Sequence, residues 1–193
     1  NPDLGVEKVW SYQAGLETNV LDVFWLKLAA FRHDLDDAIV DVRLEDDPDW
    51  WTLVNTGRQR RLGLEVAART RPVHHVTLAG NAYFMKAEDL DTREDVLGEP
   101  ERVFDVSLKY DNERVFRALL KGRYYHANEP EDYLADHGGF IVDLNLIRKI
   151  PLGARVTAEV FASVHNLLDK NEFYYYQFPN PARWYEVGVR ASF

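Results

Sequence analysis

The last forty residues constrain the fold most strongly, because their polarity alternates at every second position. In residues 183–193 one face is apolar and consists of Tyr185, Val187, Val189, Ala191 and Phe193. Residues 154–166 repeat the pattern, with Val156, Ala158, Val160, Ala162 and Val164 on one face. Such a period of two is typical of a β-strand that has unlike environments on its two sides. The two segments therefore predict a hairpin of a two-sided sheet.

Seven upstream segments carry the same alternation or a strand-like content of β-branched and aromatic residues. Together they predict nine strands, at residues 10–17, 21–33, 51–71, 74–86, 102–110, 115–126, 139–150, 154–166 and 183–193. Short connections are centred near residues 19, 72, 112 and 152, and long ones cover residues 34–50, 87–101, 127–138 and 167–182.

This strict alternation of short and long connections is the layout of an outer-membrane barrel, with short periplasmic turns and longer extracellular loops. We therefore expect an all-β fold, an antiparallel up-and-down transmembrane β-barrel. Nine antiparallel strands cannot close with regular pairing, so the segment is expected to be part of a larger barrel. A soluble lipocalin-like barrel shows the same alternation with an apolar interior and is the alternative.

Two patterns favour the membrane barrel. Large charged residues share the face opposite the apolar one, as an aqueous lumen requires; they are Glu17, Glu65, Arg69, Lys109, Arg117, Lys121, Arg123, Asp143, Glu159 and Arg190. Aromatic residues gather toward strand ends, where interfacial girdles fall. These aromatic residues are Trp10, Tyr12, Tyr110, Tyr124, Trp184, Tyr185 and Phe193.

Composition excludes several classes of protein. No apolar run approaches the ~20 residues of a membrane-spanning helix. The net charge of −9 argues against nucleic-acid binding, which needs clustered Lys and Arg. The absence of cysteine excludes disulfides, zinc–thiolate sites and a thiol nucleophile. No nucleophile elbow, P-loop or dinucleotide motif is present, so we expect neither an enzyme nor a cofactor.

Several short motifs, in order along essentially the whole chain, resemble the carboxy-terminal part of the β-barrel of TonB-dependent outer-membrane receptors. They are Asn1-Pro2-Asp3-Leu4 with Glu7, Gln13-Ala14-Gly15-Leu16-Glu17, Asn55-Thr56-Gly57, Gly63-Leu64-Glu65, Asn166-Leu167-Leu168-Asp169-Lys170, and Arg183 to Tyr185 with the terminal Phe193. The last strand also resembles the signal read by the barrel-assembly machinery, through Glu186, Gly188, Ala191 and Phe193.

The resemblance implies a barrel of about 22 strands in the outer membrane of a Gram-negative bacterium, a barrel size that plugged transporters share. Residues 1–193 would form about strands 14 to 22, with a plug domain upstream that these residues do not contain. The implied partners are membrane lipid and lipopolysaccharide, a small-molecule ligand such as a ferric siderophore, the TonB complex acting through the plug, and the barrel-assembly machinery.

Candidate ligand contacts fall in two places. The loop at 167–182 is rich in aromatic residues, and flat rings can stack on catecholate-like surfaces; its candidates are Phe173, Tyr174, Tyr175, Tyr176 and Phe178. Arg117, Lys121 and Arg123 on one lumenal face could guide an anionic ferric complex. Alternatively, the rings pack the loop or anchor it at lipid headgroups, and the cations pair with neighbouring strands or with the plug.

Acidic clusters at residues 34–41 and 129–136 lack the ligand spacing of a calcium loop, so we expect no metal site. The sequence therefore predicts active uptake of a scarce nutrient, most simply a ferric siderophore. A soluble or peripheral β-barrel binding module, and an outer-membrane adhesin or enzyme, are the alternatives.

Overall fold

The computed structural model describes residues 1–193 except 44–50, 130–137, 154–155, 171–172, 176–177 and 193. In the described part of the chain, no helix is long and apolar enough to cross a membrane. The strands are β1 (Lys8–Val20), β2 (Phe24–Arg43), β3 (Trp51–Thr70), β4 (Val76–Asp89), β5 (Glu99–Asp111), β6 (Phe116–Asn128), β7 (Gly138–Pro151), β8 (Thr157–His165), β9 (Phe173–Tyr175), β10 (Phe178–Pro179) and β11 (Trp184–Ser192).

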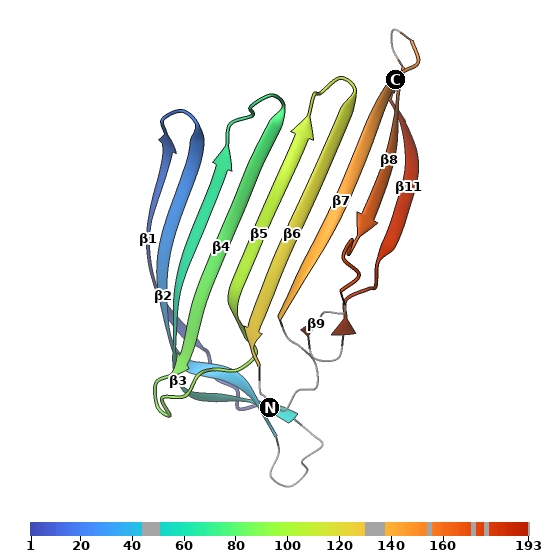
Figure 1. Cartoon of the computed structure of the whole chain (residues 1–193). Coiled ribbons are helices and arrows are strands. Elements are labelled where there is room, and N and C mark those ends of the chain that lie inside the picture. Colours follow the sequence, from blue (N-terminus) through green and yellow to red (C-terminus); the bar gives the residue numbers. More distant parts are fainter. Residues whose placement is uncertain (44–50, 130–137, 154–155, 171–172, 176–177, 193) are drawn as a thin grey trace.

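Nine of these strands form one antiparallel sheet in the order β1-β2-β3-β4-β5-β6-β7-β8-β11, which confirms the predicted up-and-down topology. β9 and β10 form a separate two-stranded sheet. The short turns lie at one end of the large sheet and the long connections at the other (Figure 1). Within the described residues, β1 pairs only with β2 and β11 only with β8, so the sheet is open.

Two short turns lie a little further along the chain than predicted. The first was expected at residues 18–20, but β1 continues to Val20, and Leu21 and Asp22 turn with φ of 48° and 53°. His74 and His75, expected to open a strand, turn with φ of 49° and 69°. Two successive residues with positive φ make the primed turns whose twist matches that of a hairpin. Leu rarely adopts this conformation, so the sequence pattern did not indicate the first of these turns.

The expectation of a long loop at residues 34–50 was wrong for residues 34–43, which continue β2. The acidic residues are tolerated in the strand because cations on the same face compensate them. Asp34 Oδ1 accepts a hydrogen bond from Arg60 Nε at 2.7 Å, and Asp34 Oδ2 lies 2.7 Å from Arg32 Nη2. Likewise, β4 and β5 extend into the predicted loop at 87–101 and leave a connection of residues 90–98.

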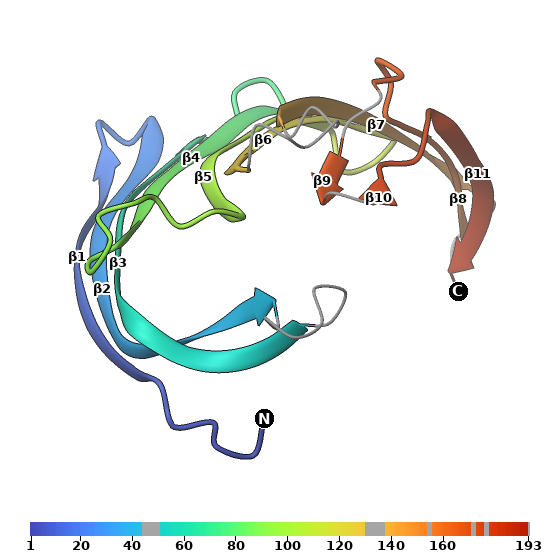
Figure 2. The ribbon, with the colours of Figure 1, turned by 90° about the horizontal axis from the view of Figure 1, so that it is seen from below.

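β2 and β3 are 20 residues long, whereas β4 to β7 have 13 or 14. The end of β2 and the start of β3, which lie beside the long connection between these strands, bend inward over the concave side of the sheet (Figure 2). Asp37 on β2 and Gly57 on β3 lie across from each other between the register pairs Asp36↔Arg58 and Ala38↔Thr56, and both have positive φ, 57° and 38°. This paired local distortion coincides with the bend.

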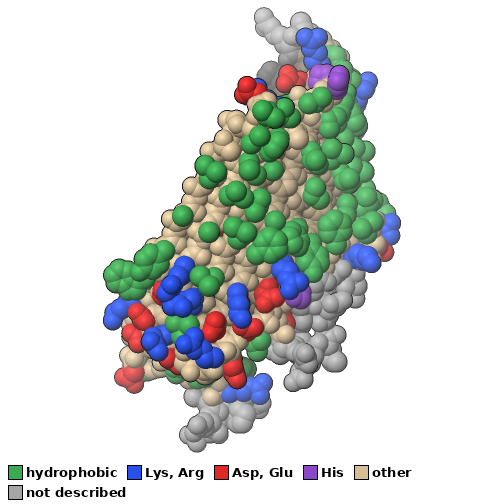
Figure 3. Space-filling view, turned by 60° about the vertical axis from the view of Figure 1, so that its left-hand side comes forward, with side chains coloured by type: hydrophobic (Ala, Val, Ile, Leu, Met, Phe, Trp, Pro, Cys, Tyr) green, Lys and Arg blue, Asp and Glu red, His purple; other side chains and the backbone are tan. Residues whose placement is uncertain are grey.

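The sheet is strongly curved, and its two faces differ in polarity (Figures 2 and 3). Apolar side chains cover the convex face, where neighbouring strands pair Leu16 with Leu28, Leu78 with Leu108 and Leu108 with Leu120. Leu16, Leu78 and Leu108 are 59%, 48% and 47% exposed. A soluble barrel would have the opposite arrangement, with its apolar face on the hollow side.

The apolar belt has the height of a bilayer core. On β1 its convex face carries no charge from Trp10 to Val20, ten residue steps of about 3.3 Å, or roughly 33 Å. At a strand tilt of about 40°, this length corresponds to a height of roughly 25 Å, the height of the lipid-facing band of a membrane barrel. Phe84, Phe104 and Tyr124 form an aromatic row at the edge of the belt, with ring centroids 5.3 and 5.7 Å apart. Of the predicted girdle residues, Trp184 instead lies on the concave face and stacks on His165 at 3.9 Å.

Glycines make room for aromatic rings across the strands. The Phe31 ring of β2 covers Gly63 of β3, and the Phe161 ring of β8 covers Gly188 of β11. A Cβ atom on either glycine would overlap the ring. These pairs fix the position of the rings on the concave face.

We expect Gly63→Val to lower the free energy of unfolding of the folded barrel by about 1–3 kcal/mol, because the Phe31 ring must move. Thermal unfolding in detergent, followed by tryptophan fluorescence, measures the change. Gly153→Val is the control, since a Cβ at this turn position meets nothing within 4 Å. Equal destabilisation by the two substitutions would contradict this packing.

Candidate functional site on the concave face

The concave face is lined by charged side chains of both signs. The strand registers place the predicted lumenal residues on this one face. Lys121 lies opposite Asp143 in the register, and Arg190 lies opposite Glu159. Arg190 Nη1 lies 3.6 Å from Glu159 Oε2. Such a wall suits contact with water or with a polar protein segment rather than with hydrocarbon.

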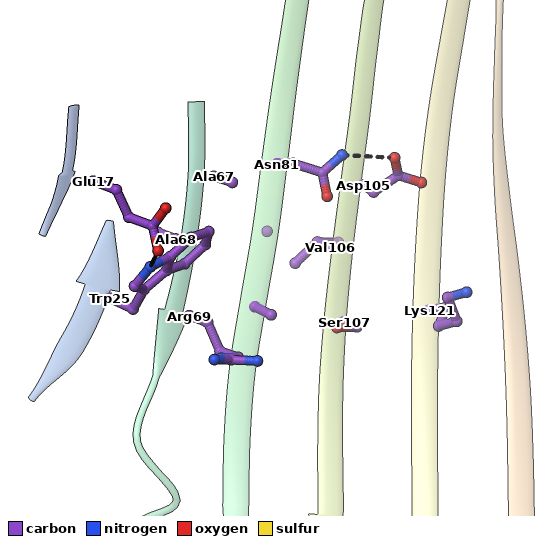
Figure 4. A pocket seen from close by; sticks show the side chains of 12 residues that line it. Glu17, Trp25, Ala67, Ala68, Arg69, Asn81, Asp105, Val106, Ser107 and Lys121 are labelled. Atoms are coloured by element: carbon purple, nitrogen blue, oxygen red, sulfur yellow. Dashed lines mark hydrogen bonds between the residues drawn. The ribbon is translucent and has the colours of Figure 1, made fainter. Parts of the chain in front are cut away.

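A depression of about 570 Å³ lies on this wall, closer to the short turns (Figure 4). On one side, Trp25 Nε1 donates a hydrogen bond to Glu17 Oε1 at 2.7 Å, and the Arg69 guanidinium lies 5.8 Å from the Trp25 ring. On the other side, Asn81 Nδ2 donates to Asp105 Oδ2 at 2.9 Å. Lys121 of β6 completes the lining.

The three predicted cations lie at alternate positions of β6 and face the concave side. Arg117 Nε donates a hydrogen bond to Asp111 Oδ2 at 2.9 Å, and Arg123 Nε lies 3.8 Å from Asp105 Oδ1. Lys121 makes no ion pair with any residue that the structure describes. Of the three, Lys121 therefore has its charge available for another molecule.

A second depression, of about 340 Å³, lies nearer the long connections, and the sequence analysis did not indicate it. Phe31 lies 4.9 Å from His33 and 6.0 Å from Tyr83, measured between ring centroids. Arg61 Nη2 pairs with Glu99 at 2.6 Å. His33 Nε2 and Arg61 Nε are buried and have no hydrogen-bond partner among the residues that the structure describes, so both remain available for one. An aromatic cluster among charged residues of the same parity is the sequence signal that could have indicated this site.

The aromatic loop lies on the concave side of the sheet (Figure 2). Its backbone pairs β9 with β10 through Phe178↔Tyr175 and Pro179↔Phe173, and Tyr174 lies between these pairs in β9. Tyr176 and the side chains of residues 171–179 lie outside what the structure describes. The ligand contacts predicted for Phe173, Tyr174, Tyr175, Tyr176 and Phe178 therefore stay predictions.

The base of this loop is held by Asn166, which is only 3% exposed. Its backbone N–H donates to Asp143 Oδ1 at 2.9 Å, and its side-chain Nδ2 donates to the carbonyls of Lys170 and Pro181 at 2.8 and 3.1 Å. Asp169 Oδ1 accepts from the backbone N–H of Arg183 at 2.8 Å. This amide and the Arg183 guanidinium lower the pKa of Asp169 from its ordinary value.

A second anchor fixes the N-terminal segment. Asn55 Oδ1 accepts from the Gly5 N–H at 2.6 Å, and Asn55 Nδ2 donates to the Asp37 carbonyl at 2.8 Å. Glu7 Oε2 accepts from the Ile39 N–H at 3.1 Å. Thus Glu7, Asn55, Asn166 and Asp169, which belong to the motifs in the sequence, hold backbone segments beside the bent strands and the aromatic loop.

In the last strand, Glu186 faces Ser163 on the concave side, Gly188 lies under Phe161 and Ala191 is on the convex side. Phe193 lies outside the described residues. The role predicted for these four residues in barrel assembly stays a prediction.

The acidic cluster at 34–41 is part of β2, and residues 130–137 of the other cluster lie outside the description. Among described residues, no group of three or more His, Cys, Asp or Glu side chains is arranged to hold a metal ion.

An open antiparallel sheet with an apolar convex belt and a charged concave wall defines a segment of a transmembrane β-barrel. The sequence matches the family of TonB dependent receptor-like β-barrels over residues 1–167, and the chain belongs to that family. A comparison with curated protein sequences gives no match.

The chain has the fold of three solved transport proteins. The copper transporter OprC superposes with a TM-score of 0.76 at 17% identity, over 97% of this chain and 31% of OprC. The siderophore receptor PirA from Acinetobacter baumannii gives 0.71 at 17% identity, over 100% of this chain and 32% of PirA. The ferric-catecholate import receptor Fiu from K12 E. coli gives 0.67 at 17% identity, over 100% of this chain and 28% of Fiu. The chain thus spans about a third of their length.

The Asp169 anchor has a testable pH dependence. Because the pKa of Asp169 is lowered in the folded state, its stabilising contribution is complete above the ordinary Asp value of about 3.9 and is lost as the pH falls through the folded pKa. We expect the Arg183 amide to be protected from hydrogen exchange at pH 7, and Asp169→Ala to remove most of this protection.

Asp22→Ala is the control, because among the described residues the ion pair of Asp22 is with Arg71 Nη2, at 3.1 Å in a distant turn. Unchanged exchange at the Arg183 amide in the Asp169 variant would contradict the anchor.

Proposed function

We propose that the chain forms part of the wall of an energy-coupled importer in the outer membrane of a Gram-negative bacterium. In this proposal residues 1–193 are about strands 14 to 22 of a barrel of about 22 strands, and a plug domain precedes them in the intact receptor. The TonB complex acts through that plug, and the barrel-assembly machinery recognises the last strand. Membrane lipid surrounds the convex face.

The observation that carries this proposal is the segregation of side chains between the two faces. A charged side chain at the bilayer midplane costs roughly 2–4 kcal/mol. The convex belt is accordingly apolar, and charged side chains gather beyond its edge (Figure 3). Asp34 and Arg60, opposite each other in the register of β2 and β3, are an ion pair on this face. The opposite face carries the wall of mixed charge that a water-filled, plugged lumen requires.

The proposed ligand is an anionic ferric siderophore. Two of the structurally similar proteins are named as a siderophore receptor and as a ferric-catecholate receptor, which supports this class of ligand. The aromatic loop on the concave side supports it too, since aromatic rings stack on flat ligands. Lys121 supplies a positive charge in the depression nearer the short turns. Transport of this kind requires no covalent chemistry by the chain.

Uptake by cells tests the function directly. A strain that lacks the gene is expected to lose energy-dependent uptake of one radiolabelled ferric siderophore, and the plasmid-borne gene is expected to restore it. A protonophore should abolish the restored uptake. Copper uptake is measured in parallel because OprC is named as a copper transporter. A protein that fractionates outside the outer membrane, or a deletion without any uptake defect, would contradict the proposal.

The substitution Lys121→Glu is expected to raise the KM for an anionic ferric complex roughly fivefold, because a change of about 1 kcal/mol in charge interaction corresponds to that factor. Maximal uptake should change little. Lys149→Glu is the control, since Lys149 Nζ donates a hydrogen bond to the Glu113 carbonyl at 2.9 Å near a short turn. Equal KM values for the two variants would exclude a role for Lys121 in guiding the ligand.

A further inference from the structure

The second depression on the concave face contains two nitrogen atoms, Arg61 Nε and His33 Nε2, that are buried and have no hydrogen-bond partner among the described residues. Arg61 and His33 lie directly opposite each other in the register of β3 and β2. Buried polar groups are almost always hydrogen-bonded in folded proteins, so two neighbouring unpaired ones indicate a place for an acceptor from another molecule. Arg61 Nε donates, and His33 Nε2 donates in the tautomer that has its proton there. A carboxylate can accept from both.

The charge of the lining argues against a simple anion. The lining contains two carboxylates, those of Glu65 and Glu99, and one guanidinium, that of Arg61. Arg61 Nη2 and Glu99 Oε1 form an ion pair at 2.6 Å, whereas Glu65 makes no ion pair or hydrogen bond with any residue that the structure describes. Lys27 lines an adjoining depression together with Glu65, but no ion pair joins these two described residues. The second depression therefore offers an unpaired carboxylate as well as two unpaired donors.

The unpaired donors and the unpaired carboxylate lie on either side of an aromatic surface. Arg61 and Glu65 are on the same face of β3, four residue steps or roughly 13 Å apart along the strand. Gly63 lies midway between them, and the Phe31 ring covers it. The Tyr83 ring stacks on the Phe31 ring, with centroids 6.0 Å apart and an interplanar angle of 24°. A ligand that reaches from the donors to Glu65 therefore lies across these rings.

We propose that the second depression binds a zwitterionic, amino-acid-like group that has an apolar part between its two charges. The carboxylate of this group accepts hydrogen bonds from Arg61 Nε and His33 Nε2, and its ammonium group pairs with Glu65. The apolar part packs on the Phe31 ring, and aromatic faces also attract an ammonium group. A group that is neutral overall suits a lining in which carboxylates outnumber cations. The volume of about 340 Å³ is that of a small-molecule site. That this group belongs to the transported ligand rests on the proposed function.

Ligand-observed NMR titration of the intact receptor in detergent tests the site with three probes, which are 4-(aminomethyl)benzoate, benzoate and benzylamine. The first probe has both charges on one ring, and each of the others has only one of them. The wild-type receptor is expected to bind 4-(aminomethyl)benzoate roughly tenfold more tightly than either other probe, because each of those loses a hydrogen bond between charged groups. Glu65→Gln should remove the advantage over benzoate, and Arg61→Gln should remove the advantage over benzylamine.

The matched controls are Glu159→Gln and Arg190→Gln, because these two side chains lie on the same face and pair with each other at 3.6 Å on β8 and β11. Both controls should keep the wild-type preferences. Equal binding of 4-(aminomethyl)benzoate by Glu65→Gln and Glu159→Gln, or no binding by the wild-type receptor, would overturn the site. Equal affinity of the wild-type receptor for benzoate would overturn the zwitterion in favour of a plain anion. Glu65 is exposed, so its variant provides the test should Arg61→Gln not fold.

Cell uptake by the same variants separates this site from the proposed transport. A receptor that takes up a ferric siderophore normally but binds the three probes equally contradicts only the zwitterion site. A receptor that prefers 4-(aminomethyl)benzoate but restores no uptake contradicts only the proposed transport.

Discussion

Backbone hydrogen bonding between neighbouring strands is the constraint on which the rest of this structure depends. Inside a bilayer each unpaired N–H or C=O group costs several kcal/mol, so a wall made of strands must pair every one of them with a neighbour. The antiparallel ladder does this on both sides of each strand from β2 to β8, and its regular register holds alternate residues on opposite faces over nine strands. The apolar belt and the charged wall are consequences of that register. They place hydrocarbon on one side of the wall and a polar interior on the other.

The same ladder explains where special residues are needed. Gly63 and Gly188 lie where a ring on the adjacent strand crosses the backbone of the concave face. Asn55 lies within β3 beside the N-terminal segment, and Asn166 follows the end of β8; their amide groups bond to backbone groups that the ladder leaves unpaired. Glu7, Asn55, Asn166 and Asp169, which belong to the family motifs, are therefore structural anchors at the long-connection end of the sheet.

Much of the fold could be predicted from the sequence, because alternation is a local pattern. The nine strands and the division of their faces follow from it.

The extension of β2 through Asp34 could not be predicted in this way, since the compensating Arg60 lies on the next strand. The turn at Leu21 and Asp22 also lacked a local signal. For the candidate site, the sequence predicted the face on which Arg117, Lys121 and Arg123 lie. It did not predict that Asp111 pairs with Arg117 and Asp105 with Arg123, which leaves Lys121 without an ion pair among the described residues. The cluster of Phe31, His33 and Tyr83 depends on register across three strands.

The most direct test of the account is the environment of two adjacent residues on β5. Val106 is on the convex face and Ser107 on the concave face, and the chain contains no cysteine to interfere with labelling. A spin label attached to Val106→Cys in the membrane-embedded receptor is expected to collide mainly with lipid-soluble oxygen, and one at Ser107→Cys mainly with a water-soluble nickel complex. Equal accessibility at the two positions, or the reverse order, would contradict a wall with hydrocarbon on one side and an aqueous lumen on the other.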